Sequence, residues 1–308
     1  GGLGDTQMSR SAGLPTGEVA GGCFCCRFSD LLDAAEQLRS FAPDVIFAEP
    51  VGSCVDLSAT ILQPLKAFHA GEYRVAPLTL LMDPESARAV VAGEADPDVR
   101  YLFEKQIQEA DIVCTTKSDL YDSVPPLPCD IEFRTSAVTG EGVSEWLNEA
   151  LESKRVVGAR LLDVDYTRYA EAEAALSWLN MHVNIDVSEP VTPAGLIGPL
   201  LENIDGGLTQ GGIAIAHLKV FDRADGAYVK AGVCRNGSEP AVEGDLCASP
   251  AVRHETVINL RAIGDPEELR RIVREALDQT GGEITVRHDG AFRPAPPKPE
   301  HRFKALAR

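Results

Sequence analysis

The feature that most constrains the fold of this chain is a succession of short apolar runs that end in polar residues and alternate with helical patterns. The apolar runs lie within 43–53, 75–83, 111–119 and 129–137. Amphipathic helical patterns occupy 28–41, where Ser29 is the expected N-cap, 99–110 and 142–153. This alternation predicts a parallel sheet that is covered by helices on both faces. Ligands of such sheets bind beyond the carboxyl ends of the strands, which is where the polar residues of this chain fall.

The pattern changes after residue 155. Apolar and polar residues alternate in "HLKV" (217–220) and "VINLR" (257–261), which is typical of antiparallel strands with one solvated face. A helix with Asp265 as N-cap and Pro266 at its first position follows. We therefore predict an α/β domain over 1–155, a smaller α+β domain over 156–290, and an extended, Pro-rich basic tail over 291–308 that docks on the acidic body or on a partner.

Charge and hydropathy exclude several classes of protein. The formal net charge of -18 argues against nonspecific binding to nucleic acid or to an anionic membrane surface. No apolar run reaches the length of about 18 residues that a transmembrane helix needs, and "GGLGDTQMSR" at the start has no signal-peptide pattern. These features predict a cytoplasmic protein without nucleic-acid or membrane partners. In such a chain, eight cysteines indicate metal or redox chemistry more than a disulfide framework.

Three of the cysteines, Cys23, Cys25 and Cys26, are clustered in the segment "GGCFCCRFS". Thiolates are soft ligands that suit Zn(II) or Cu(I), and Co(II) occupies similar sites. Three thiolates with one exchangeable position suit a metal carrier better than a permanent structural site. Glu18 and Cys54 both remain open as the fourth ligand. The competing interpretation is a redox-sensitive or merely solvent-facing cluster.

The segment "DIVCTTKSD" (111–119) places T-K-S-D directly after an apolar run. In nucleotide-binding domains, a strand that ends in N/T-K-x-D recognises guanine, because a carboxylate such as that of Asp119 accepts two hydrogen bonds from the base edge. The aliphatic stem of Lys117 is expected to lie against the loop and the base, with its ammonium group in water. Four residues alone are a weak signal, since Lys and Asp are common in surface turns. The context strengthens it, because "TSAVTGEG" (135–142) follows one strand later, where a second base-contacting loop belongs.

Four segments together resemble the CobW/UreG/HypB group of P-loop GTPases, and most of all its CobW branch. They are "EVAGGCFCC", "VIFAEPVG", "KQIQEADIVCTTKSD" and "TSAVTGEGV", and they occur in the family's order within residues 1–150. The resemblance implies a P-loop GTPase-type parallel sheet, with GTP, Mg²⁺ and either Zn²⁺ or Co²⁺ as cofactors, and hydrolase activity. The residue roles that it implies are metal ligation by Cys23, Cys25 and Cys26, catalysis by Glu49, and nucleotide binding by Gly52, Thr116, Lys117, Asp119, Ser136 and Ala137.

The chain departs from the family pattern in two places. No G-x-x-x-x-G-K-S/T motif, which cradles the phosphates and holds Mg²⁺, occurs in the 308 residues. We therefore expect the chain to begin just after that unit, with Asp5 in the first switch region, to bind GTP poorly and to hydrolyse it negligibly, so its enzymatic activity stays open. The family also often has a proline at the position of Asp56, and the loop after Glu49 is expected to be built differently here.

Two functions are compatible with these features. The first is a GTP-dependent metallochaperone or metallocofactor-assembly protein, related to the cobalamin or corrinoid assembly factors, that serves a client metalloprotein or a cofactor-assembly enzyme. The second is a non-catalytic metal-binding or interaction protein with a degenerate GTPase fold. The sequence leaves open the client, the physiological metal and whether the chain forms a homodimer.

Overall fold

The structure, a computed structural model, describes residues 6, 9–10, 12–19, 22–152 and 154–307. The chain forms two compact units. The first, which we call the cysteine unit, comprises residues 19–172 and 296–308, and the second, the α+β unit, comprises 1–18 and 173–295. The chain passes from one unit to the other within helix α7 (Tyr166–Ala175).

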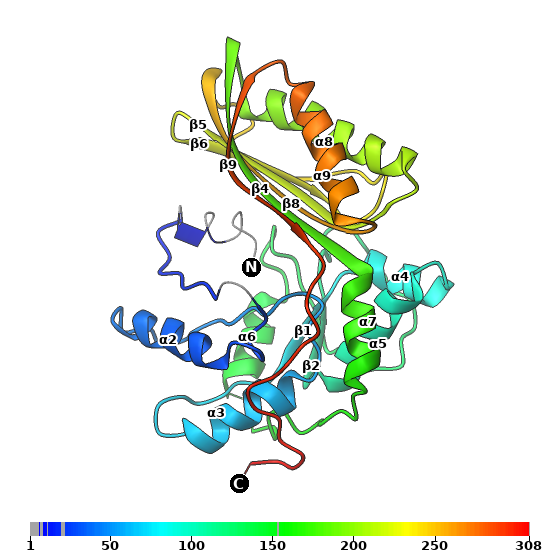
Figure 1. The fold of residues 1–308 in the computed structure, drawn as a ribbon. Helices are drawn as coiled ribbons and strands as arrows, with labels where there is room; N and C mark the ends of the chain where they lie inside the picture. Colours follow the sequence, from blue (N-terminus) through cyan, green and yellow to red (C-terminus); the bar gives the residue numbers. More distant parts are fainter. Residues whose placement is uncertain (1–5, 7–8, 11, 20–21, 153, 308) are drawn as a thin grey trace. The chain divides into compact units, whose positions relative to one another are not determined.

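The cysteine unit contains a three-stranded parallel sheet, which confirms the α/β fold class (Figure 1). The central strand β2 (Ile112–Thr115) is buried along its whole length and pairs with β1 (Thr79–Met82) on one side and β3 (Phe133–Arg134) on the other. Because the three strands are parallel, the polar loops that follow them emerge at the same edge of the sheet. The helical segments of this unit before α7 are α2 (Phe28–Arg39), the π-helical turn η1 (Ser58–Leu62), α3 (Gln63–Phe68), α4 (Pro84–Ala92), α5 (Pro97–Glu109) and α6 (Val143–Glu152).

The buried strand that was expected within 43–53 is not formed, and this prediction was wrong. Residues 45–48 belong to no strand, and Val45 and Phe47 are 39% and 70% exposed. Within the described ranges, this apolar run pairs with no strand and is largely exposed, so neither a hydrogen-bonded ladder nor burial stabilises it. Glu49 and Gly52 therefore lie in an irregular loop.

The start of α2 also differs from the expectation. Its N-cap is Arg27, whose side chain makes no capping hydrogen bond, so Ser29 lies inside the first turn. The Ser29 N–H donates to the Glu300 carboxylate at 3.3 Å, and Ser29 Oγ donates to the same oxygen at 2.8 Å. The N-cap prediction was wrong because the acceptor for the first turn comes from the other end of the chain and not from a local side chain.

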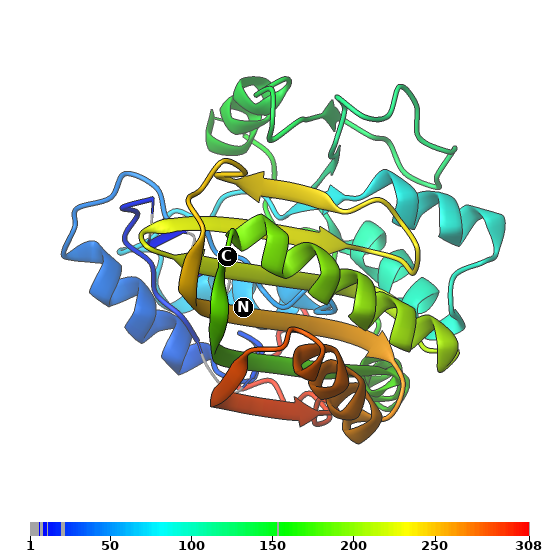
Figure 2. The ribbon, with the colours of Figure 1, turned by 90° about the horizontal axis from the view of Figure 1, so that it is seen from above.

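The α+β unit is built on a six-stranded antiparallel sheet in the order β7-β6-β5-β8-β4-β9. Helices α8 (Pro193–Gln210) and α9 (Pro266–Asp278) lie across one face of this sheet (Figures 1 and 2). The antiparallel strands were predicted and are confirmed, as is the N-cap Asp265, which accepts from the N–H groups of Glu267 and Glu268. The strands are β4 (Leu176–Val191), β5 (Ala214–Ala224), β6 (Ala227–Val233), β7 (Ala241–Gly244), β8 (Ala251–Ile263) and β9 (Glu283–Phe292).

Alternation along β4 separates the two faces of this sheet. Every second side chain from Leu179 to Ile185 is fully buried and joins the apolar core beneath α8 and α9. Between them lie polar positions such as Asn180, whose Oδ1 accepts from Asn259 Nδ2 at 2.9 Å and from Arg261 at 3.2 Å. Around Asn180, the opposite face of the sheet therefore has polar groups that bond to one another.

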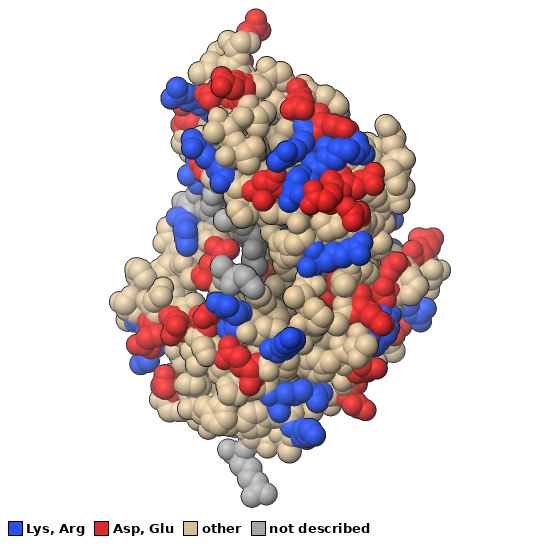
Figure 3. Space-filling model, viewed as in Figure 1, with Lys and Arg blue, Asp and Glu red and all other residues tan. Residues whose placement is uncertain are grey.

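Acidic and basic side chains are interspersed on the face of the molecule that Figure 3 shows. On and beside α9, Arg270 and Arg274 both pair with Asp289, at 2.9 Å and 2.5 Å, and Arg271 pairs with Glu275 at 2.7 Å. Much of the positive charge of this helix is thus neutralised locally. Of the helices in the described ranges, none has the length and hydropathy that a membrane crossing requires.

Candidate metal and nucleotide sites

The cysteine loop, residues 23–27, is one tight turn directly before α2. The backbone N–H groups of Cys26 and Arg27 both donate to the Cys23 carbonyl at 3.1 Å. A turn closed in this way places residues three apart on the same side, and the sulfurs of Cys23 and Cys26 approach to 3.3 Å. Phe28 follows and is 2% exposed, so it fixes the loop against the apolar cluster that includes Ile61.

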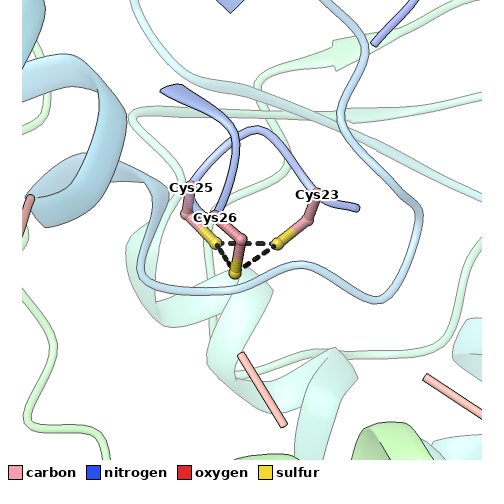
Figure 4. Close-up of side chains that lie close together, drawn as sticks. All are labelled: Cys23, Cys25 and Cys26. Carbon is pink, nitrogen blue, oxygen red and sulfur yellow. Dashed lines mark hydrogen bonds between the residues drawn. The ribbon is translucent and has the colours of Figure 1, made fainter. Parts of the chain in front are cut away.

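The three sulfurs of the loop converge on one point (Figure 4). Cys25 Sγ lies 2.8 Å from Cys23 Sγ and 3.7 Å from Cys26 Sγ, and all three atoms lie within 4.8 Å of one another. A tetrahedral ion with Zn–S bonds of about 2.3 Å holds its sulfurs about 3.8 Å apart. The spacing of Cys25 and Cys26 already matches this geometry, and Cys23 has to withdraw by about 0.5–1 Å to admit an ion. The cluster therefore fits a thiophilic cation after a small widening of the turn.

The protonation of the three thiols is uneven. Hydrogen bonds from Cys25 and then from Cys54 hold the pKa of the Cys23 thiol far below its usual value. The same bond to Cys23, followed by burial, raises the pKa of the Cys25 thiol, and burial raises that of Cys26. One thiolate thus forms readily, whereas the other two protons leave when a cation takes their place. Metal binding by this cluster is therefore expected to release protons.

Cys54 lies beside the cysteine loop. It is 2% exposed, belongs to the same apolar cluster as Cys25 and Phe28, and makes a side-chain hydrogen bond with Cys23. Glu18, the other candidate for a fourth ligand, is an exposed residue of the α+β unit. The structure therefore supplies a fourth sulfur next to the three that the sequence pattern singled out.

Glu49 and Gly52 are both exposed on the loop that leads to Cys54. Gln106 of α5 fastens this loop, because its side-chain amide donates to the carbonyl oxygens of Gly52 at 2.8 Å and of Cys54 at 3.1 Å. A Cβ atom at Gly52 would meet no atom within 4 Å. Packing within the described residues therefore does not require glycine at this position, and the contact of Gly52 with a nucleotide stays a prediction.

The T-K-S-D loop follows β2 at the carboxyl edge of the sheet, as predicted. The Thr116 N–H donates to the Met82 carbonyl at 3.0 Å, and Lys117 has a left-handed backbone with φ of 57°. The Lys117 ammonium group forms an ion pair of 2.6 Å with Asp83, whereas we expected it in water. The sequence pattern missed Asp83, which directly follows β1 and N-caps α4. Asp119 is exposed on the loop, where its carboxylate is accessible to a ligand.

The second predicted base-contacting loop lies against the first. Ser118 joins them, because its N–H donates to the Thr135 carbonyl at 3.0 Å and its Oγ donates to Glu141 at 2.8 Å. Ser136 is buried, and its Oγ accepts from two backbone N–H groups of its own loop at 3.2 Å and 3.1 Å. Ala137 is exposed. The structure thus brings the two loops together, and their contact with guanine stays a prediction.

The loop after Gly52 contains a residue whose role sequence reasoning missed. Asp56 is fully buried, and its Oδ2 accepts from Arg302 Nε at 2.6 Å and from the Tyr166 hydroxyl at 2.8 Å. Its φ of 64° is a conformation that proline does not adopt, so the proline that the resemblance implies at this position would not fit the loop as it is built here. Asp5, which we expected in the first switch region, lies outside the described residues.

Comparison with known proteins covers the part of the chain that contains the cysteine loop and the T-K-S-D loop. Residues 4–135 match the family model of the CobW/HypB/UreG nucleotide-binding domain. This segment is similar to the CobW/HypB/UreG family. It contains the cysteine loop, Glu49 and the T-K-S-D loop, and it ends where the second predicted base-contacting loop begins.

Two solved structures were found, both of the GTPase YjiA. One is the Zn(II)-bound YjiA GTPase from E. coli, and the other is a Zn(II)-bound triple mutant of YjiA. Each is 12% identical in sequence and has a TM-score of 0.24, and each comparison covers 82% of this chain and 76% of the other. A comparison with curated proteins finds no match.

Proposed function

We propose that this protein is a metallochaperone that carries Zn²⁺ or Co²⁺ in the cysteine loop and transfers it, under the control of GTP, to a client metalloprotein or a cofactor-assembly enzyme. The observation that carries the proposal is the convergence of the sulfurs of Cys23, Cys25 and Cys26 within 4.8 Å of one another. The similarity of residues 4–135 to a nucleotide-binding family supports the nucleotide part.

The accessibility of the sulfurs suits a carrier whose ion is cargo. Cys25 is buried, whereas Cys23 and Cys26 are half-buried, so two of the three sulfurs remain partly accessible to an incoming ligand. A thiolate or imidazole of the client enters a coordination position and displaces one loop sulfur after another. A fully enclosed site with four rigid ligands would hold the ion too firmly for such an exchange.

The nucleotide part rests on the arrangement of three loops. Asp119, Thr116, Lys117, Ser136 and Ala137 lie on the two adjacent loops that are proposed to hold guanine, and Glu49 and Gly52 are proposed to face Mg²⁺ and the terminal phosphate. The loop that carries Glu49 continues to Cys54, whose thiol bonds to Cys23. A movement of this loop on GTP binding would therefore reach the sulfur cluster through a single contact.

A cobalt titration tests the metal site. Co²⁺ bound by thiolates gives a charge-transfer band, and we expect about one equivalent to produce it. The band should be absent from the Cys23→Ser, Cys25→Ser, Cys26→Ser triple variant. A matched control replaces Cys129, Cys234 and Cys247, which lie outside the cluster, and it should bind cobalt normally. A band that survives in the first variant, or that disappears equally in both, would refute the proposal.

A second candidate function is a metal-binding or interaction protein without turnover. It shares the cluster of Cys23, Cys25 and Cys26 with the first candidate and differs from it in having no control by GTP. The two candidates differ in whether GTP binding changes the affinity for the metal. A metal titration with and without a nonhydrolysable GTP analogue measures this difference. It uses the chain joined to a P-loop segment of the family type. Coupling of about 5–150-fold in metal affinity supports the chaperone. Equal affinities in the two titrations favour the second candidate.

A further inference from the structure

The C-terminal segment 296–307, which we call the strap, packs along the cysteine unit and passes close to α3 (Figure 1). It contains neither helix nor strand. Pro296, Pro297 and Pro299 fix the backbone in an extended form and have no N–H group. Lys298 is therefore the one residue of 296–299 that has a backbone donor.

That single donor is directed at a sulfur of the cluster. The Lys298 N–H donates to Cys26 Sγ at 3.1 Å. The next N–H along the strap, that of Glu300, donates to the Cys25 carbonyl at 2.9 Å. Two successive donors of the strap thus end on the cysteine loop, which lies more than 270 residues earlier in the chain.

The Glu300 side chain adds a second contact at the same place. Its carboxylate accepts from the N–H of Ser29 at 3.3 Å and from Ser29 Oγ at 2.8 Å. Because Arg27 provides no side-chain cap for α2, this carboxylate serves as the missing acceptor. Its negative charge also suits the positive end of the helix dipole. The strap therefore fixes the helix that begins directly after the sulfur cluster.

The other end of the strap is anchored to the loop that follows Gly52. Arg302 donates to the buried carboxylate of Asp56 at 2.6 Å and to the Leu162 carbonyl at 3.0 Å. The Phe303 N–H donates to the Ala59 carbonyl of η1 at 2.9 Å. The strap thus bonds at once to the cysteine loop and to the segment around Asp56.

We infer that the strap is a working part of the metal site, in which the Lys298 N–H is an outer-shell donor to the Cys26 sulfur and Glu300 and Arg302 are positioning residues. The inference rests on the proposed function, because it takes the cysteine loop to be a metal site. A hydrogen bond to a ligand sulfur withdraws charge from it and fixes its orientation. By linkage, an ion bound to Cys26 strengthens the docking of the strap to the same extent as the strap strengthens ion binding.

Two substitutions at one position isolate the N–H group. Lys298→Pro extends the run of prolines, retains the extended backbone and removes the donor, whereas Lys298→Ala removes the side chain and retains the donor. We expect Lys298→Pro to weaken Co²⁺ binding about tenfold, the low end of the range for outer-shell partners, and Lys298→Ala to bind like the wild type. The charge-transfer band should move to longer wavelength in Lys298→Pro alone, because the Cys26 sulfur is more electron-rich without the hydrogen bond.

Amide hydrogen exchange, measured in the 308-residue chain without metal, reports whether the strap is docked. The Lys298 amide should be protected in the wild type and should exchange fast in Cys26→Ala. The Glu300 and Phe303 amides show whether the strap stays docked in Lys298→Pro. Whether the strap stays docked or not, Lys298→Pro has lost the N–H donor to Cys26. A charge-transfer band at the wild-type position in this variant would therefore overturn the inference. Identical cobalt affinities of the two Lys298 variants would overturn it as well.

The triple serine variant separates this inference from the proposed function. If that variant loses cobalt while both Lys298 variants bind alike, the metal site stands and the role of the strap is refuted. If that variant retains cobalt, the metal proposal is refuted together with the inference, whether or not the strap amides are protected.

Discussion

The two units of the molecule are held together differently. The α+β unit has one apolar core of 25 buried residues between its sheet and two helices. Among its described residues, the cysteine unit has three separate clusters of five buried residues each. Buried polar side chains also connect its loops: Asp111 Oδ2 accepts from the N–H groups of Leu78 at 3.0 Å and of Gly158 at 2.7 Å, and Gln63 donates to the Gly158 carbonyl at 2.8 Å.

The difference indicates where local movement is least costly. A continuous core opens as a whole, whereas small clusters joined by directional hydrogen bonds open piece by piece. The cysteine loop, Glu49, Gly52 and the two predicted base-contacting loops, which have to admit and release ligands, lie in the cysteine unit. The continuous core of the α+β unit makes local opening of that unit more costly.

The largest effect on stability is expected from Ile204→Ala in the α+β core. Ile204 is fully buried beneath the sheet, so its truncation should cost about 4 kcal/mol of unfolding free energy and leave cobalt affinity unchanged. Ile61→Ala, in the cluster behind the cysteine loop, should cost about 2 kcal/mol and alter the cobalt spectrum. Urea unfolding and cobalt titration measure both variants. If Ile204→Ala disturbed the metal site more than Ile61→Ala, the contrast between the units would be lost.

Glu109 makes the cysteine unit sensitive to pH. It is 1% exposed, its carboxylate accepts from the Ser58 N–H, and burial raises its pKa from 4.5 to about 7. The folded state therefore binds this proton more tightly than the unfolded state does. Its contribution to stability is fully present below pH 4.5 and is lost as the pH rises through 7.

The loss over this window amounts to about 3 kcal/mol, since one pKa unit corresponds to about 1.4 kcal/mol. Glu109→Gln cannot ionise, so its unfolding free energy should decline less than that of the wild type between pH 5 and pH 8. Urea unfolding at both pH values checks this. Parallel pH dependences of the two proteins would show that Glu109 does not titrate in this range.

Asp119→Asn tests whether the paired loops recognise guanine. In the chain joined to a P-loop segment, the loss of the charge-assisted pair should cost about 1.5–3 kcal/mol of binding, or roughly tenfold or more in GTP affinity. Xanthosine triphosphate should become the relatively better ligand, while the cobalt band stays in place. Equal affinity of the parent protein for ATP and GTP, measured with fluorescent nucleotides, would show that these loops do not select the base.

The smallest effect concerns a helix start in the α+β unit. Asp265 caps α9 locally, so Asp265→Ala should cost about 1 kcal/mol of unfolding free energy without any change in cobalt binding. At the start of α2, by contrast, the acceptor is the distant Glu300, so Glu300→Ala should both destabilise the protein and loosen the cysteine loop. Urea midpoints and the cobalt spectrum separate the two outcomes. Cobalt binding that changes in Asp265→Ala and not in Glu300→Ala would contradict this account.

The sequence by itself determined the features that depend on spacing along a short stretch of chain. Three cysteines within four residues limit how far apart their sulfurs can lie, and the polar residues that directly follow parallel strands must meet at one edge of the sheet. The local cap Asp265 and the alternation along β4 are signals of the same kind.

Tertiary structure alone decided the features whose partners are far apart in the chain. The apolar run at 45–48 forms no strand because strand formation depends on a neighbour, and Lys117 pairs with an acid that follows another strand. Lys298 bonds to a sulfur 272 residues away, and Arg302 to a carboxylate 246 residues away. No local pattern encodes such contacts, because a backbone N–H or a surface arginine has the same sequence signature whichever acceptor the folded chain brings to it.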